Sequence, residues 1–128
     1  MRITGEQMRA MLVEIANERP DYVYERPEGF GGACVYVHNG EPSCIIGHAL
    51  ARFGVPLDDV ELLDYMPNYD GDLPEEKDSA FVGDAHFSNT LTKRGVYLDV
   101  SALNIADAVQ ALQDSSISWG AAVERSLK

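Results

Sequence analysis

The chain has 128 residues, the length of one ordinary domain, and a chain of this size buries roughly two-thirds of its unfolded surface without a disulfide or a metal. Its ten Lys and Arg residues are outnumbered by twenty-one Asp and Glu residues, so the formal net charge is −11. Because this much negative charge repels phosphate backbones and anionic lipids, the composition disfavours direct nucleic-acid binding and membrane binding.

The redox compartment is indicated by the first residues and by the cysteine content. The start of the chain has no apolar segment typical of a secretory signal, and no stretch approaches the roughly 18 apolar residues of a membrane span. The two cysteines, Cys34 and Cys44, are then expected to be reduced thiols. We expect a single cytoplasmic domain over residues 1–128.

The first helix has the clearest signals in the sequence. Thr4 and Gln7 have the spacing of a capping box, and Ile3 and Met8 occupy the two positions of a hydrophobic staple. The apolar stripe that follows stops before Pro20, which cannot continue a helix.

Two stretches after this helix favour strands. Residues 21–25 and 33–38 are rich in Val and Tyr, and we expect them to pair through Tyr22 and Tyr36. Asn39 and Gly40 then favour a tight turn, although the proline that follows soon after keeps any returning strand very short. The sequence predicts a small antiparallel sheet of two or three strands.

The rest of the chain is mainly helical in its patterns. We predict helices that begin after Ser43, at Leu57 and at Ala85, with an acidic loop over residues 65–79. A strand or extended link covers residues 96–100. Two further helices are predicted after N-cap residues Ser101 and Ser118. The expected fold class is α+β, mostly helical.

Four residues have the side chains of a zinc site, namely Cys34, His38, Cys44 and His48. If residues 34–38 form a strand, the first two side chains lie roughly 13 Å apart, too far to share one ion. Cys44 and His48 lie one helical turn apart and could supply two ligands, or Cys44 could act as a nucleophile at a helix N-terminus. We expect buried thiols and no cofactor, with these four residues as weak metal candidates and no catalytic residue identified.

Residues 45–64 imitate a helix-turn-helix motif. The second helix, which would enter the DNA groove, has four acidic residues and no Lys or Arg. Because DNA affinity comes largely from neutralising phosphates, this composition argues against direct DNA binding.

The negative charge is concentrated in one part of the chain. Residues 58–84, which we call the acidic segment, contain ten of the twenty-one acidic residues, and Lys77 is the only Lys or Arg among them. This segment is either a solvated acidic loop or a docking surface for a basic partner. Aromatic and Met side chains within it favour the docking interpretation. The predicted partner-binding residues are Asp58, Asp59, Glu61, Asp64, Tyr65, Met66, Tyr69, Asp70 and Asp72.

A set of short motifs resembles a known group of proteins. They are Cys34-x-Tyr36, the run Cys44-Ile45-Ile46-Gly47-x-Ala49-Leu50, the pair Gln113-Asp114, and Trp119-Gly120-x-Ala122. Together they resemble small uncharacterised proteins of actinobacteria and of actinobacteriophages. The resemblance implies a phage accessory factor inside a bacterial host and implies no catalytic residue.

We therefore expect a non-enzymatic binding protein that engages a host protein with a basic surface, and a stronger form of this hypothesis is a DNA mimic. Two alternatives remain open at this point: a small metal- or thiol-dependent protein that uses Cys44 and His48, and a helix-turn-helix DNA-binding protein. The partner and the oligomeric state are not determined by the sequence.

Overall fold

The fold was analysed in a computed structural model that describes residues 1–27, 31–32, 34–67 and 70–127. The described part of the chain contains six α-helices and one short 3-10 helix. The helices are α1 (Gly5–Glu18), α2 (Ile45–Arg52), α3 (Leu57–Glu61), η1 (Leu62–Asp64), α4 (Ala85–Lys93), α5 (Val100–Asp114) and α6 (Trp119–Ser126). The strands are β1 (Arg2–Ile3), β2 (Gly31–Gly32), β3 (Val37–His38), β4 (Glu41–Pro42), β5 (Asp78–Ser79) and β6 (Tyr97–Leu98).

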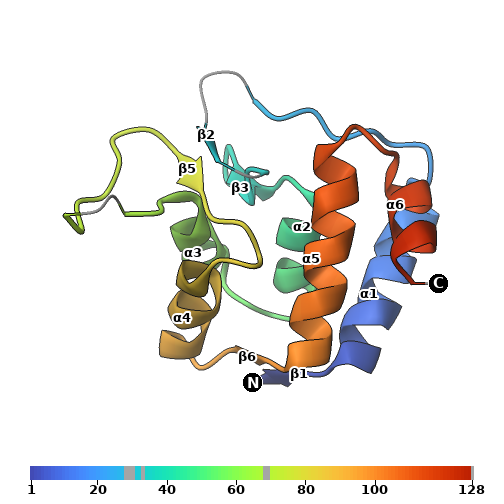
Figure 1. Ribbon diagram of the computed structural model, residues 1–128, viewed down its shortest axis with the longest axis horizontal. Coiled ribbons are helices and arrows are strands. Elements are labelled where there is room, and N and C mark those ends of the chain that lie inside the picture. The colour runs from blue at the N-terminus through green and yellow to red at the C-terminus, as the bar shows by residue number, and fades with distance from the viewer. Residues whose placement is uncertain (28–30, 33, 68–69, 128) are drawn as a thin grey trace.

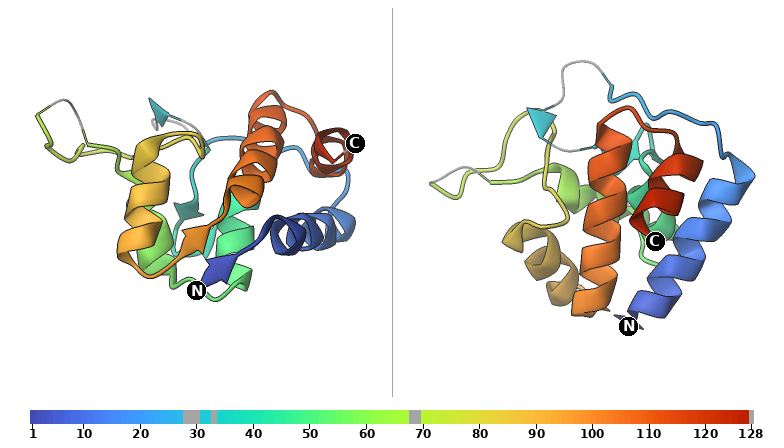
Figure 2. Two further views of the ribbon diagram at one scale, coloured as in Figure 1. Left: turned by 60° about the horizontal axis from the view of Figure 1, so that its bottom comes forward. Right: turned by 45° about the vertical axis from the view of Figure 1, so that its right-hand side comes forward.

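Helix α5 is the centre of the helical arrangement. It packs against α1, α2 and α6, and α1 also contacts α2 and α6 (Figure 1). Helices α3 and α4 lie on the other side of α5 from α1 and α6 (Figures 1 and 2). The described residues between η1 and β5, namely 65–67 and 70–77, project away from the helices (Figures 1 and 2). The predicted α+β fold with a mostly helical chain is confirmed, and the acidic loop is its most outlying part.

The sheets are three separate pairs of two-residue strands. Strand β1 pairs with β6 and β2 pairs with β5, both in parallel, whereas β3 and β4 form an antiparallel hairpin. The turn of this hairpin has positive φ angles at Asn39 (53°) and Gly40 (77°), as a tight turn of this kind requires. The short returning strand after Asn39-Gly40 is therefore confirmed.

The predicted pairing of residues 21–25 with residues 33–38 is wrong. The backbone N–H of Tyr22 donates to Arg19 O at 3.1 Å, and Tyr22 O accepts from Trp119 N at 2.9 Å. The segment is therefore held by the end of α1 and the start of α6. Tyr24 reaches the 34–38 stretch only through its hydroxyl, which accepts from Val35 N at 2.9 Å.

Two helix starts were predicted with the correct cap, and two need correction. The capping box of Thr4 and Gln7 is present, and Ser118 caps α6 by accepting from Ala121 N. Helix α5, however, is capped by Asp99, which accepts from Ala102 N at 2.8 Å, and not by Ser101. Helix α2 begins after Cys44 without a side-chain cap, so Ser43 is not its N-cap.

The hydrophobic core joins all six α-helices. Its largest fully buried side chains include Trp119, Tyr36 and Phe87, and the predicted stripes of α1 and α2 lie within it. Within the described part of the chain, no helix has both the length and the apolar character needed to cross a membrane.

Candidate functional site

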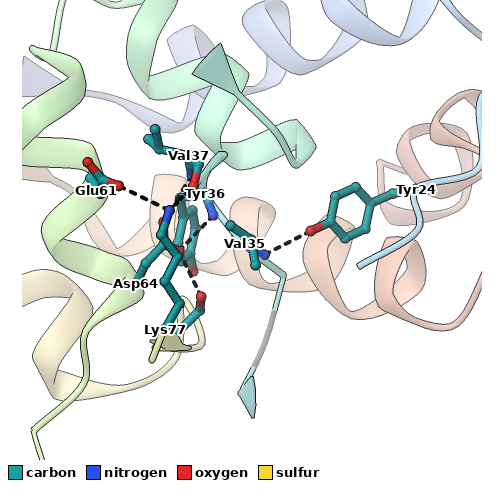
Figure 3. Close-up of polar contacts among 8 residues, drawn as sticks. Tyr24, Val35, Tyr36, Val37, Glu61, Asp64 and Lys77 are labelled. Carbon is teal, nitrogen blue, oxygen red and sulfur yellow. Dashed lines mark hydrogen bonds and ion pairs between the residues drawn. The ribbon is translucent and has the colours of Figure 1, made fainter. Parts of the chain in front are cut away.

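The acidic segment has one carboxylate in the interior. Asp64, at the end of η1, is fully buried and accepts three hydrogen bonds (Figure 3). The donors are Tyr36 N at 2.7 Å, Val37 N at 3.0 Å and the hydroxyl of Ser79 at 2.7 Å. Burial raises the pKa of the Asp64 carboxyl, and these hydrogen bonds together with Lys77 oppose that rise. Asp64 therefore ties η1 to the 35–37 backbone and to β5.

Lys77 points toward the same interior site (Figure 3). Its side chain is only 10% exposed, and its Nζ lies 3.0 Å from Glu61 Oε2 and 3.5 Å from Asp64 Oδ2. The ammonium also donates to the backbone carbonyl of Val37. The only Lys or Arg of the acidic segment is thus directed inward, and its charge is compensated by carboxylates of the same segment.

The acidic loop begins and ends at one place on the fold. Met66 N donates to Asp78 O, and Ala80 N donates to Leu63 O, both at 2.9 Å. Tyr65 and Asp78 form an isolated parallel bridge beside these bonds. Loops whose two ends are held close together in this way are frequently functional in proteins.

The predicted partner-binding residues fall into three groups. Asp58, Asp70 and Asp72 are exposed. Asp59 and Glu61 are partly buried and form ion pairs, with Arg94 and Lys77 respectively. Tyr65 and Met66 are partly buried near the neck of the loop, whereas Tyr69 lies outside the described residues.

Asp64 must be removed from the predicted binding surface. With 0% exposure it cannot touch a partner, and its three hydrogen-bond donors occupy the carboxylate. Sequence analysis grouped it with its acidic neighbours because charge alone does not show which side of a short helix faces inward.

An apolar recess lies beside the exposed acids. Leu62 and Tyr65 line two adjoining hollows, one of about 300 Å³ and the other of about 230 Å³. The larger hollow is completed by Asp58 and Glu61. The smaller one is completed by side chains of the projecting loop and of α4 and its C-terminal end, namely Leu73, His86, Thr90, Lys93 and Arg94.

Two predicted zinc-ligand candidates, Cys34 and Cys44, are brought together in the interior. Both are free and buried, at 1% and 0% exposure. Burial raises the pKa of Cys34 well above its ordinary value, and its interaction with the Cys44 thiol raises it further. Cys34 therefore remains a neutral thiol, which is a poor nucleophile.

The two histidines are not part of that pair. His48 packs its ring edge-on to Trp119 at 5.4 Å, and His38 lies in the β3–β4 hairpin. Within the described ranges, no three His, Cys, Asp or Glu side chains gather in a way that could hold a metal ion. The N–H of Ile45, at the start of α2, is already bonded to Gln113 Oε1 at 2.8 Å, so it is not available to stabilise a thiolate on Cys44.

Sequence analysis missed a buried network built on two glutamines of α5. Gln110 accepts from Val82 N at 2.8 Å and donates to the Tyr36 hydroxyl at 2.8 Å. Gln113 accepts from Ile45 N and from the Trp119 indole at 3.0 Å. The available signal was their spacing of three residues, which places both amides on the buried face of α5 together with Val109.

Several motif residues quoted for the family resemblance meet in this network. Tyr36 O lies so close to Gly47 that a Cβ there would be 2.1 Å from it, and a Cβ on Gly120 would be 2.8 Å from Pro20 O. These glycines allow close backbone approach, which is a structural role. Helix α2 therefore packs against the Tyr36 backbone at Gly47.

A cavity of about 480 Å³ borders Cys34. It is lined by Tyr24, Glu25, Arg26, Cys34, Phe81, Asp114 and Ser116. Asp114 accepts from Gln113 Nε2 at 3.0 Å, and burial raises the pKa of its carboxyl although this hydrogen bond and Arg26 oppose the rise. Cys34, the one thiol on the described walls of this cavity, is held in its neutral form.

A comparison of the chain with protein-family models, curated proteins and solved structures finds no match. The functional argument therefore depends on the residues and geometry described above.

Proposed function

We propose that this protein is a non-enzymatic binding protein that docks a basic partner protein on its acidic surface. We define the acidic surface by exposed carboxylates of α3 and of the projecting loop: Asp58, Asp70, Asp72, Glu75, Glu76 and Asp78. Tyr65 and Met66, at the neck of the loop, are partly buried.

The inward direction of Lys77 is the observation that carries this proposal. An outward lysine would reduce the negative potential of the loop, but this one is 10% exposed and bonded to Glu61, to Asp64 and to the backbone. The surface of the segment therefore presents mainly carboxylates. Such a surface attracts a positively charged partner and repels nucleic acid and anionic membranes.

The interior location of the thiols supports a binding role over a thiol-dependent one. Cys34 and Cys44 are buried and Cys34 is held neutral, which disfavours a reaction of either thiol with a solute. The helix-turn-helix alternative is also less favoured, because α3 is short and has Asp58 and Asp59 in its first turn.

The resemblance to small actinobacterial and actinophage proteins favours a partner in an actinobacterial host cell, and this remains part of the proposal. A DNA mimic is its stronger form, in which the partner normally uses the same basic surface to bind DNA. Competition separates the two forms, because duplex DNA displaces a DNA mimic from its partner and leaves an ordinary docking protein bound.

A charge-reversal experiment tests the docking proposal. The triple variant Asp58→Lys, Glu75→Lys and Glu76→Lys should lose capture of its partner from an actinobacterial lysate, read by mass spectrometry. The matched control replaces Glu6, Asp21 and Glu41, which are exposed outside the acidic surface, and changes the net charge by the same amount. Capture by the control should persist and should weaken as salt screens the contact.

Equal capture by both variants would contradict the proposal. Equal loss in both would show that total charge matters and that location does not, which also contradicts it.

A further inference from the structure

The recess beside the acidic surface has an apolar floor and an apolar rim. Leu62 and Tyr65 form the floor shared by its two hollows, and both are partly exposed. Leu73, from the projecting loop, borders the smaller hollow with 68% of its surface exposed. An exposed leucine next to an apolar floor gains from being covered, because apolar surface leaves water when a second apolar side chain enters.

The two ends of the recess have opposite charge. Asp58 and Glu61 border one end, and Lys93 and Arg94 border the other. Glu61 and Arg94 are both engaged in ion pairs, because Glu61 is 3.0 Å from Lys77 and Arg94 Nε is 3.2 Å from Asp59. The difference in charge between the two ends therefore comes mainly from the exposed Asp58 and the exposed Lys93. A ligand in the recess experiences this difference along its length, with apolar contacts in the middle.

We propose that this recess binds a peptide segment of the partner in which a large apolar side chain lies between basic residues and an acidic residue. The basic residues lie at the Asp58 and Glu61 end, the apolar side chain covers Leu62, Tyr65 and Leu73, and the acidic residue faces Lys93 and Arg94. This inference rests on the proposed function, and it adds an apolar contact and a direction that the acidic surface alone does not provide.

Charge complementarity at two ends explains why the occupant is a peptide with this order of charges. A uniformly basic segment would match Asp58 but would be repelled at Lys93. Aromatic residues are the favoured apolar occupants, because they contribute large contact area in protein interfaces with little loss of conformational freedom.

Three labelled peptides measured by fluorescence anisotropy test the proposal. The first contains two lysines, a tryptophan and a glutamate, in that order, between glycine–serine flanks. In the second the tryptophan is replaced by alanine, and in the third the glutamate is replaced by lysine. We expect the first peptide to bind most tightly, with a loss of about thirtyfold when the tryptophan is removed, which is the smallest effect that marks an interface hot spot.

Two single variants locate the apolar contact. Leu73→Ser should weaken binding of the tryptophan peptide and leave the alanine peptide unchanged. Val100→Ser is the matched control, since Val100 is 71% exposed at the start of α5 and does not line the recess. Both positions are mostly exposed, so neither change should unfold the protein, and thermal unfolding of the variants verifies this.

A charge exchange tests the direction of the peptide. Lys93→Glu should reverse the preference, so that the peptide with lysine in place of glutamate binds more tightly than the first peptide. Asp58→Lys should weaken all three peptides.

The outcomes distinguish this inference from the proposed function. If the tryptophan and alanine peptides bind equally while Asp58→Lys weakens both, the recess inference is overturned and docking on the acidic surface stands. If no peptide binds at concentrations of about 1 mM, the range of very weak complexes, the inference is also overturned. The lysate capture with its charge-matched control then decides the proposed function independently.

Discussion

Asp58 and Asp64 lie six residues apart in the same acidic run, yet they belong to regions with different roles. Asp64 is part of an interior polar network in which each group has partners far away in the sequence, including Tyr36 and Ser79. Asp58 belongs to the acidic surface, where the carboxylates face solvent. Acidic residues of one segment can therefore stabilise the interior or, as we propose, bind a partner at the surface. Lys77 belongs to the interior group, because its ammonium pairs with Asp64.

We expect the greatest loss of stability when the interior carboxylate is removed. Asp64→Ala leaves two backbone N–H groups, the Ser79 hydroxyl and Lys77 without their buried acceptor. We expect the free energy of unfolding to fall by about 3–5 kcal/mol, as when one partner of a buried ion pair is lost. Urea titration followed by circular dichroism measures the loss.

Asp58→Ala is the control for that experiment, because it removes the same side chain at an exposed position. Its free energy of unfolding should change by no more than about 0.5 kcal/mol. Similar losses in the two variants would show that the interior and surface acids are not distinct in the way described here.

The glutamine network of α5 provides a second test of the interior polar groups. Gln113→Met keeps a similar volume but leaves the Ile45 N–H and the Trp119 indole N–H without an acceptor. With at least about 1 kcal/mol for each orphaned buried donor, we expect a loss of at least about 2 kcal/mol. Asn104, exposed on the same helix, is the control, and Asn104→Ala should leave the urea midpoint nearly unchanged.

We expect the smallest change in the free energy of unfolding at Asp114, which belongs neither to the interior network of Asp64 nor to the acidic surface. Partial burial raises the pKa of Asp114, even though Gln113 and Arg26 act to lower it. Because this pKa is higher in the folded state than in the unfolded state, the ionised carboxylate reduces stability above the folded-state pKa. That penalty disappears as the pH falls below about 3.9, the ordinary aspartate pKa.

Asp114→Asn should therefore unfold at a slightly higher urea concentration than the parent protein at neutral pH. The asparagine can still accept from Gln113 Nε2, and the difference should shrink as the solution becomes acidic. A difference of the same size at every pH would show that the charge of Asp114 is not its cause.

Most local structures could be predicted from neighbouring residues. The capping box at Thr4, the tight turn at Asn39-Gly40 and the Ser118 cap depend on contacts within three or four residues. The Asp99 cap of α5 is equally local, but Ser101 offered a competing cap two residues later. The strand formers around Tyr22 predicted a pairing that does not form, because Tyr22 O accepts instead from Trp119 N at the distant start of α6.

The candidate site also has one part that the sequence predicted and one part that only the structure shows. Composition located the negative charge in residues 58–84, and the structure keeps Asp58, Asp70 and Asp72 on the outside. The inward positions of Asp64 and Lys77 could not be read from the sequence. Their partners, the backbone at Tyr36 and Val37, lie 27 to 40 residues away.

By itself the sequence determined a mostly helical α+β chain with its negative charge in one segment, because helix periodicity, capping and composition are properties of neighbouring residues. Only the tertiary structure decided which members of that segment face inward and where Leu62, Tyr65 and Leu73 form a recess. The physical reason is that burial of a charge depends on partners that folding brings together across the chain, as the pairing of Asp64 with distant backbone N–H groups and with Lys77 shows.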